Sequence, residues 1–376
     1  MTKNVMTTKF RSISNGQGDS FIIQDNERNY LFDSGQSYRR IKKSIPKKID
    51  IAICSHNDND HSSGFVGLLN DWNKEIAELW LPGYWLPIIL FCKDLNEDIS
   101  SIQWSDSLNI GEKFDQYLKN ISIQNSGELL DNFDVETTKD IYEDLAFLAD
   151  YNADFPSYLS YYYPFHDQLF SKLLSKIHFE TKNLIKIVKL AYERECRIKW
   201  FYPTNKEVHS KPLSEGFLPL NSNEACSIKK IKNNDFICFL SLIQLSRENK
   251  YSIVFEYYKK DKPIILLTAD NDLSFIDTPK NYNNEIIITA PHHGSDSCNA
   301  AYLKIRADKI IWVRSWGPRN RNAGITLIND MKTGNNEGYC DFCIDYNDGN
   351  KKIDLQLINN SWKCIKGRKC ICRYCR

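Results

Sequence analysis

The chain has 376 residues, of which 42% are hydrophobic and 26% are charged. This composition is typical of a folded globular protein and excludes a disordered or fibrous chain. Lysine and arginine total 49 against 48 acidic residues, so the net charge of +1 provides no general attraction to nucleic acids or anionic membranes. We therefore expect any polyanion to be bound by a local basic patch.

No segment reaches the ~18 consecutive apolar residues of a membrane-spanning helix, and the first residues lack the apolar core of a signal peptide. We therefore predict a cytoplasmic protein that does not interact with membranes. In that compartment the 12 cysteines are expected to stay reduced.

Apolar runs predict strands at both ends of the chain and helices in the middle. SFIIQ, NYLFDSG and IDIAICS near the start, and YSIVFEYY, PIILLTAD, EIIITAPHH and KIIWVRS near the end, are short, β-rich and bounded by turn residues. Between them, leucines and isoleucines recur at helical spacing in FSKLLSKIHFETKNLIKIVKLAYERE, and FYPTNKEVHSKPLSEGFLPLNSNE has the composition of a linker. The sequence thus predicts half-domains at residues 1–85 and 236–335, a helical insertion at 86–235 and a Cys-rich tail at 336–376.

The segment SHNDNDH directly follows the predicted strand IDIAICS and carries four candidate metal ligands, His56, Asp58, Asp60 and His61. A strand that ends in a tight loop can direct alternate side chains inward, so His56 with Asp58 could hold one cation beside a second held by Asp60 and His61. A bound cation would offset the cost of burying these charges. A solvated turn is the alternative, because Asn and Asp are also common turn residues.

Further polar residues follow other predicted strands. The run EIIITA leads into His292 and His293, and Asp270 ends PIILLTAD, where it could bridge two cations. Asp33 ends NYLFD in the same way. Taken singly, each aspartate is more often a turn or helix-cap residue, but the set as a whole predicts a metal site.

The ordered motifs GQGDS, LFDSG, SHNDNDH, LLTAD and PHHGS resemble the metallo-β-lactamase superfamily. They are most similar to the hydrolase domain of bacterial competence (DNA-uptake) channel proteins, which carries an aspartate at the position of Asp58. The resemblance covers residues 10–85 and 236–335. It implies an α/β fold, a four-layer αββα sandwich with the metal site along one edge.

The resemblance also implies roles for individual residues. Asp270 would bridge the cations, His292 would close the site, and Asp33 would orient a histidine or the loop. His293 would be either an alternative ligand or a proton donor. The implied metal ligands are His56, Asp58, Asp60, His61, Asp270 and His292.

The implied reaction is hydrolysis by water activated on one or two cations. Asp60 or Asp58 would orient that water and accept its proton, and His293 would protonate the leaving group. Zinc is the first expectation for the metal, with Mn²⁺ or Mg²⁺ as alternatives because Asp58 adds an oxygen ligand.

Two features depart from the superfamily pattern. A further histidine ligand usually lies between the first ligand loop and the bridging aspartate, but His166, His178 and His209, which occupy that interval, do not follow predicted strands. The first metal position is therefore expected to be held weakly or through water. The late histidine or lysine of many relatives is also absent from WGPRNRNAG.

For the substrate, the resemblance points to a phosphodiester, and hence to a phosphodiesterase or nuclease. Trp312 and Trp316 lie near a basic cluster that could bind phosphates while the rings stack on bases: Arg314, Arg319 and Arg321. Buried tryptophans with solvated arginines are the alternative.

One fold can host many chemistries, so the main rival among enzymes is a hydrolase of small esters, lactones or cyclic nucleotides. The rival outside enzymes is a binding subunit that docks a protein partner through the insertion.

The last 37 residues contain six cysteines, with C-x2-C pairs at both ends of the segment. Such pairs have the spacing of zinc ligands, and a hairpin predicted around Asp348-Gly349 would bring them together. We therefore predict a structural zinc site in the tail, with free cysteines in a plain hairpin as the alternative. Its candidate ligands are Cys340, Cys343, Cys364, Cys370, Cys372 and Cys375.

Overall fold

The computed structural model describes residues 7–14, 18–86, 183–208, 211–213, 216–224, 249–315, 323–341, 352–367 and 369. All of them belong to one compact unit of the chain. Residues 87–182 of the predicted helical insertion lie outside the described residues.

Within the described residues, one mixed sheet contains nine strands in the order β15-β14-β1-β2-β3-β4-β5-β6-β8. Strands β3 to β6 run parallel to one another, and the remaining pairs are antiparallel. The strands are β1 (Thr8–Ile13), β2 (Phe21–Asp25), β3 (Arg28–Phe32), β4 (Lys48–Ile53), β5 (Glu75–Pro82), β6 (Arg197–Pro203), β8 (Ser222–Glu224), β14 (Lys352–Ile358) and β15 (Ser361–Lys366).

The second sheet has six strands in the same part of the chain, in the order β13-β12-β11-β10-β9-β7. Strands β10 to β13 are parallel, whereas β9 pairs antiparallel with β10 and with β7. The strands are β7 (Phe217–Pro219), β9 (Phe255–Lys259), β10 (Lys262–Leu267), β11 (Lys280–Thr289), β12 (Ile305–Arg314) and β13 (Glu337–Cys340).

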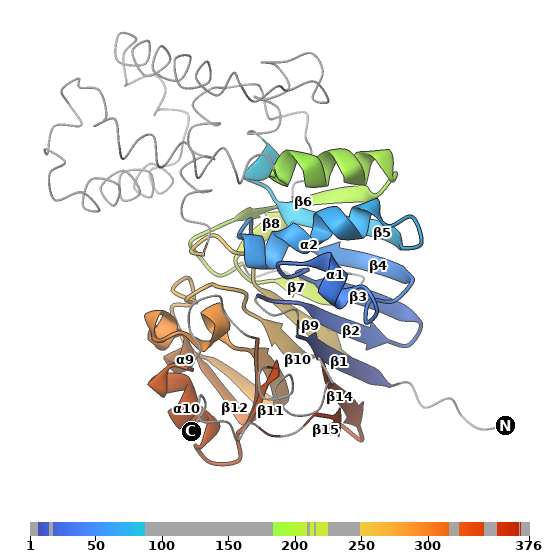
Figure 1. Cartoon of the computed structure of the whole chain (residues 1–376). Coiled ribbons are helices and arrows are strands. Elements are labelled where there is room, and N and C mark those ends of the chain that lie inside the picture. Colours follow the sequence, from blue (N-terminus) through green and yellow to red (C-terminus); the bar gives the residue numbers. More distant parts are fainter. Residues whose placement is uncertain are drawn as a thin grey trace, which may run out of the picture. The chain divides into compact units, whose positions relative to one another are not determined.

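Helices accompany both sheets. Figure 1 shows α1 (Tyr38–Ile41) and α2 (Asn59–Asn70) beside the first sheet, and α9 (Asn299–Leu303) and α10 (Ile325–Met331) beside the second. Residues 183–193 are also helical, and two 3-10 turns, η4 (Pro291–Gly294) and η5 (Asp296–Cys298), follow β11. None of the described helices is both long and apolar enough to cross a membrane.

Two apolar clusters hold the second sheet in place. The inter-sheet core combines residues of both sheets, among them Trp80, Phe255 and Val313. The outer core joins Trp312 on the opposite face of β12 to Leu327 of α10. Because neighbouring residues of a strand point to opposite faces and both faces are buried here, the strands appear in the sequence as continuous apolar runs.

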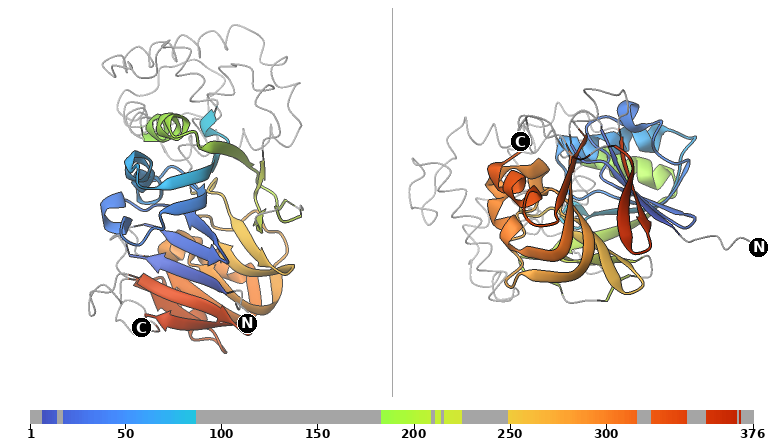
Figure 2. Two further views of the ribbon diagram at one scale, coloured as in Figure 1. Left: turned by 90° about the vertical axis from the view of Figure 1, so that its right-hand side faces the viewer. Right: turned by 90° about the horizontal axis from the view of Figure 1, so that it is seen from below.

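Two boundaries differ from those predicted. Strands β6, β7 and β8 lie within residues 86–235, yet they extend both sheets, so the chain has rejoined the domain well before residue 236. The predicted tail is also part of the domain, because β13 completes the second sheet and the β14–β15 hairpin pairs with β1. Figure 2 shows this hairpin, in red, next to the first strands of the chain. These segments are integrated because their alternating apolar residues, such as Ile353, Leu355 and Trp362, contribute to the inter-sheet core.

Candidate metal centre

Loops that follow parallel strands of both sheets bring distant parts of the sequence together. Asp33 follows β3 and His56 follows β4, whereas Asp270, His293 and Ser315 come after β10, β11 and β12. Ligand sites in such sheets commonly lie at the carboxyl ends of the parallel strands. The strand order therefore explains why these residues form one site.

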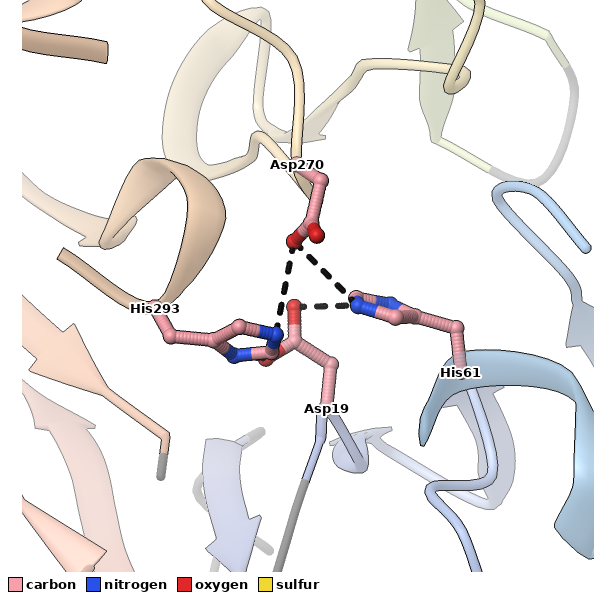
Figure 3. A group of neighbouring side chains, drawn as sticks. All are labelled: Asp19, His61, Asp270 and His293. Carbon is pink, nitrogen blue, oxygen red and sulfur yellow. Dashed lines mark ion pairs between the residues drawn. The ribbon is translucent and has the colours of Figure 1, made fainter. Parts of the chain in front are cut away.

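A buried group surrounds one oxygen of Asp270 (Figure 3). Asp19, His61, Asp270 and His293 each offer a donor atom, and these atoms all lie within 4.8 Å of one another. Asp270 Oδ1 is 3.2 Å from His61 Nε2 and 3.6 Å from His293 Nε2. Asp60 Oδ2 lies 3.3 Å from the same His293 nitrogen. We call this group, with Asp60, the inner position.

A second group surrounds the other oxygen of Asp270. His56 and Asp58 form it together with Asp270, and His56 Nε2 is 4.0 Å from Asp270 Oδ2 and 3.6 Å from Asp58 Oδ2. His292 Nε2 also lies 3.6 Å from Asp270 Oδ2. The side chains of Asp58 and His292 are 28% and 33% exposed, so this outer position faces solvent.

Five buried atoms at the two positions could bind a metal ion and make no hydrogen bond. The buried Nε2 atoms of His56, His61 and His293, together with Asp270 Oδ1 and Asp19 Oδ2, make no hydrogen bond. Buried polar atoms are nearly always hydrogen-bonded, so five such atoms at one place require an explanation. A divalent cation provides one, and imidazole nitrogens with carboxylate oxygens are ligands that suit zinc and manganese. The cluster can therefore hold a metal ion.

Asp33 orients two of the histidines. Its Oδ2 accepts a hydrogen bond from His61 Nδ1 at 2.8 Å and another from Ser55 Oγ at 2.7 Å. Because the Ser55 hydroxyl hydrogen is thus engaged, its oxygen accepts from His56 Nδ1 at 2.9 Å. Both imidazoles therefore carry hydrogen on Nδ1, which leaves Nε2 available as a ligand.

Charges within the cluster shift the pKa values of its members. Burial alone would lower the pKa of His61 and of His293, but the surrounding carboxylates together, Asp270 first among them, outweigh burial and raise both pKa values well above the ordinary histidine value. Burial would raise the pKa of Asp270, yet the histidines hold it well below the usual range. Without a cation, protons on the histidines therefore balance the carboxylate, and a cation must displace them.

Close backbone packing places Asp19 in the site. Gly18 has a φ of +89°, and a Cβ there would lie only 1.6 Å from the carbonyl oxygen of Asp60. The backbone N–H of Asp19 donates to that same oxygen at 3.1 Å. Only glycine permits this approach, which brings Asp19 next to the first turn of α2.

The two adjacent histidines differ from the expected arrangement. His293, predicted as a proton donor or alternative ligand, is buried at the inner position. His292, predicted as the closing ligand, is partly exposed, and its Nδ1 lies 3.2 Å from Ser297 Oγ. Both residues have left-handed backbone conformations, with φ values of 46° and 55°, so the turn separates their side chains in a way that strand alternation does not predict.

Part of the prediction of substrate-binding residues is wrong. Arg314 is completely buried, and its Nε donates to the carbonyl oxygen of His293 at 2.8 Å, so it supports the ligand loop instead of contacting substrate. Trp312 is buried in the outer core and cannot stack on a base. Arg319, Arg321 and Trp316 lie outside the described residues.

The two described cysteines of the predicted tail site do not lie together. Cys340 is in the outer core, whereas Cys364 packs against the inter-sheet core. Among the described residues, no group able to hold a metal includes a cysteine. The prediction of a zinc site that uses both Cys340 and Cys364 is therefore wrong, because the two thiols lie on opposite sides of the second sheet. Cys343, Cys370, Cys372 and Cys375 lie outside the described residues.

Three residues of the site were not predicted: Asp19, Ser55 and Ser315. Asp19 belongs to the GQGDS motif, whose two glycines beside a carboxylate indicate a close backbone approach. Ser55 precedes the first ligand loop, but Ser315 has no distinctive sequence context.

Comparison with known proteins agrees with this geometry. Residues 13–90 match the family model of the metallo-beta-lactamase superfamily, a segment that contains Asp19, Asp33 and the His56–His61 loop. No curated protein matches the chain, so no named relative supports the narrower similarity to competence proteins. The mixed α/β fold is consistent with that of the superfamily, whose members are hydrolases. Residues 13–90 are therefore similar to the metallo-beta-lactamase superfamily, and together with the buried histidines and aspartates this similarity indicates a metal-dependent hydrolase.

Proposed function

We propose that this chain is a metal-dependent phosphodiesterase or nuclease with the four-layer αββα arrangement of its superfamily. The observation that carries the proposal is the convergence of unpartnered donor atoms on both oxygens of Asp270. One carboxylate that bridges two cation positions suits an in-line displacement at phosphorus, in which an attacking and a leaving oxygen both need stabilisation. The motif resemblance to DNA-uptake hydrolases supports the same substrate class.

Zinc is the first candidate for both positions, with Mn²⁺ or Mg²⁺ as alternatives at the oxygen-rich outer position. Divalent cations held there would lower the pKa of a water molecule to about 7 and stabilise the charge on the reacting oxygens. At the inner position, the chain supplies His61, His293 and the neighbouring carboxylates. At the outer position, it supplies His56 and Asp58.

The exposure of the remaining side chains indicates which of them are suited to transfer protons. The Asp58 side chain is 28% exposed, against 12% for Asp60, so Asp58 is the carboxylate better placed to accept a proton from water. His292 faces solvent and is held at Nδ1 by Ser297, so it is the histidine suited to protonate the leaving group. His293 is buried and therefore less suited to that role. In this proposal His292 is the proton donor, and His293 has the ligand role that the sequence analysis gave as one of its two alternatives.

Substrate assays test the proposal. The zinc- or manganese-loaded protein is incubated with single-stranded DNA, duplex DNA, RNA and a bis-aryl phosphodiester, and in parallel with an aryl ester and a lactone. We expect hydrolysis of phosphodiesters that a chelator stops and that Asp270→Ala abolishes. Asp272→Asn is the matched control, because Asp272 lies two residues away and, among the described residues, accepts a single hydrogen bond, from the backbone of Ser274.

The remaining outcomes each point to a different function. Hydrolysis of only the ester or lactone would show that the site is a hydrolase of small esters. Turnover of no substrate by a metal-loaded protein would favour a subunit that binds a protein partner through the insertion predicted at residues 86–235.

A further inference from the structure

The side chain of Ser315 lies between His293 and Asp19. His293 Nδ1 is 2.8 Å from Ser315 Oγ and 3.3 Å from Asp19 Oδ1, and Ser315 Oγ donates a hydrogen bond to that carboxylate oxygen. All three residues are almost completely buried. Solvent therefore does not compete for these hydrogen bonds.

The hydrogen-bonding capacities of the three groups determine which atom donates and which accepts in each of these hydrogen bonds. A serine hydroxyl has one hydrogen, and the carboxylate of Asp19 can only accept it. The Ser315 oxygen is then an acceptor, as is Asp19 Oδ1, so His293 Nδ1 must be the donor. A neutral His293 consequently keeps its lone pair on Nε2, the atom that faces Asp60 and Asp270.

We propose that Ser315 and Asp19 are positioning residues that fix the tautomer and ring orientation of His293, so that its Nε2 binds the metal at the inner position. The inference rests on the proposed function only in requiring that this position holds a cation. It assigns roles to two residues beyond the ligand loops.

The same arrangement occurs on the other sheet. There His56 Nδ1 donates to Ser55, which donates to Asp33. Each sheet thus supplies one histidine and one serine at the end of a parallel strand, and each serine donates to a buried aspartate of the first sheet, Asp33 after β3 or Asp19 before β2. Such outer hydrogen bonds orient metal-binding histidines and strengthen them as ligands. The repetition favours a role in metal binding over a role in packing alone.

Zinc binding by full-length variants tests the proposal. We expect Ser315→Ala to lower the zinc affinity, measured by competition with a chelator, by about 10- to 100-fold. Ser315→Thr keeps the hydroxyl and should bind nearly as tightly as the unsubstituted protein. Thr8→Val is the matched control, because it also removes a buried hydroxyl that donates to a carboxylate, Asp25, at the other end of β2.

The tautomer gives a second readout that packing does not affect. In the zinc-loaded unsubstituted protein, long-range proton–nitrogen NMR correlations should show His293 protonated at Nδ1. Unchanged zinc affinity in Ser315→Ala, an equal loss in Thr8→Val or in Ser315→Thr, or a His293 protonated at Nε2 would each overturn the proposal. Since none of these measurements uses a substrate, a failure to hydrolyse phosphodiesters would count against the proposed function alone.

Discussion

Arg314 Nε donates a hydrogen bond to the carbonyl oxygen of His293 across 2.8 Å. The arginine is completely buried at the end of β12, directly before Ser315. His293 has a φ of 55°, a left-handed conformation that costs a non-glycine residue roughly 1 kcal/mol. Arg314, the last residue of β12, therefore holds the backbone of His293, and Ser315, the next residue, holds the ring of His293.

Replacing Arg314 should destabilise the fold. Arg314→Met removes the donor to His293 and the cation beside the buried Asp341, whose pKa burial raises and Arg314 partly lowers. We expect the free energy of unfolding to fall by about 3 kcal/mol, measured by urea denaturation. Arg306→Met, at an exposed position of the same strand, is the control and should change little. Equal effects of the two substitutions would refute the structural role of Arg314.

The two adjacent histidines should behave differently when replaced. His293→Ala removes a ligand of the inner position and should abolish zinc binding there, as measured by metal analysis after dialysis. His292→Ala should retain the inner metal but reduce kcat by about 100-fold, because it removes a proton donor. The assignment fails if His292→Ala loses the inner metal while His293→Ala keeps it.

Metal binding should strengthen as the pH rises. The pKa values of His61 and His293 are raised well above the ordinary value in the metal-free protein, so binding must release their protons. Chelator competition between about pH 6 and about pH 9 should show increasing zinc affinity, and calorimetry in two buffers should count the released protons. An affinity independent of pH would contradict these shifts.

The stability of the metal-free protein should show the opposite trend. For a histidine whose pKa is higher in the folded state, the stabilisation is complete below the unfolded-state pKa of about 6.5 and is lost as the pH rises through the folded-state value. The melting temperature of the chelated protein should therefore fall over that range. His61→Gln should flatten the decline, and an unchanged slope in that variant would exclude His61 as its source.

Gly18 should tolerate no side chain. A Cβ there would overlap the carbonyl of Asp60, so Gly18→Ala should lower the free energy of unfolding by about 3 kcal/mol and displace Asp19. Gly334→Ala is a matched control, because Gly334 also has a positive φ, 57°, but a Cβ added there would meet no atom within 4 Å. The control should cost about 1 kcal/mol, from backbone strain alone. Similar losses in both variants would argue against the close approach.

The described tail cysteines should not bind metal. Zinc content of the double variant Cys340→Ser, Cys364→Ser should equal that of the unsubstituted protein. Cys340→Ser alone should reduce stability by about 1 kcal/mol, because it places a hydroxyl in the outer core. Loss of about one zinc per chain in the double variant would instead support the predicted thiolate site that uses these residues.

Local sequence was sufficient to predict the ligand loops and the strands that precede them. The apolar runs before His56, Asp270 and His292 are recognisable because both faces of each strand are buried. The cluster of ligands in SHNDNDH is equally visible, since four of them lie within six residues. The sequence did not predict the extent of the domain, because β6, β7 and β8 are short strands among loop-forming residues.

The sequence by itself determined where metal-binding side chains lie along the chain and that they end apolar strands. Only the tertiary structure decided that His293 is buried beside Asp270, that Arg314 supports the backbone, and that Cys340 and Cys364 are apart. The physical reason is that the periodicity of a strand specifies on which face of the sheet a side chain lies. Which other side chain it contacts there depends on the order of the strands and on how the two sheets pack. Asp19 and Ser315 are 296 positions apart in sequence, yet they meet because the two sheets pack face to face.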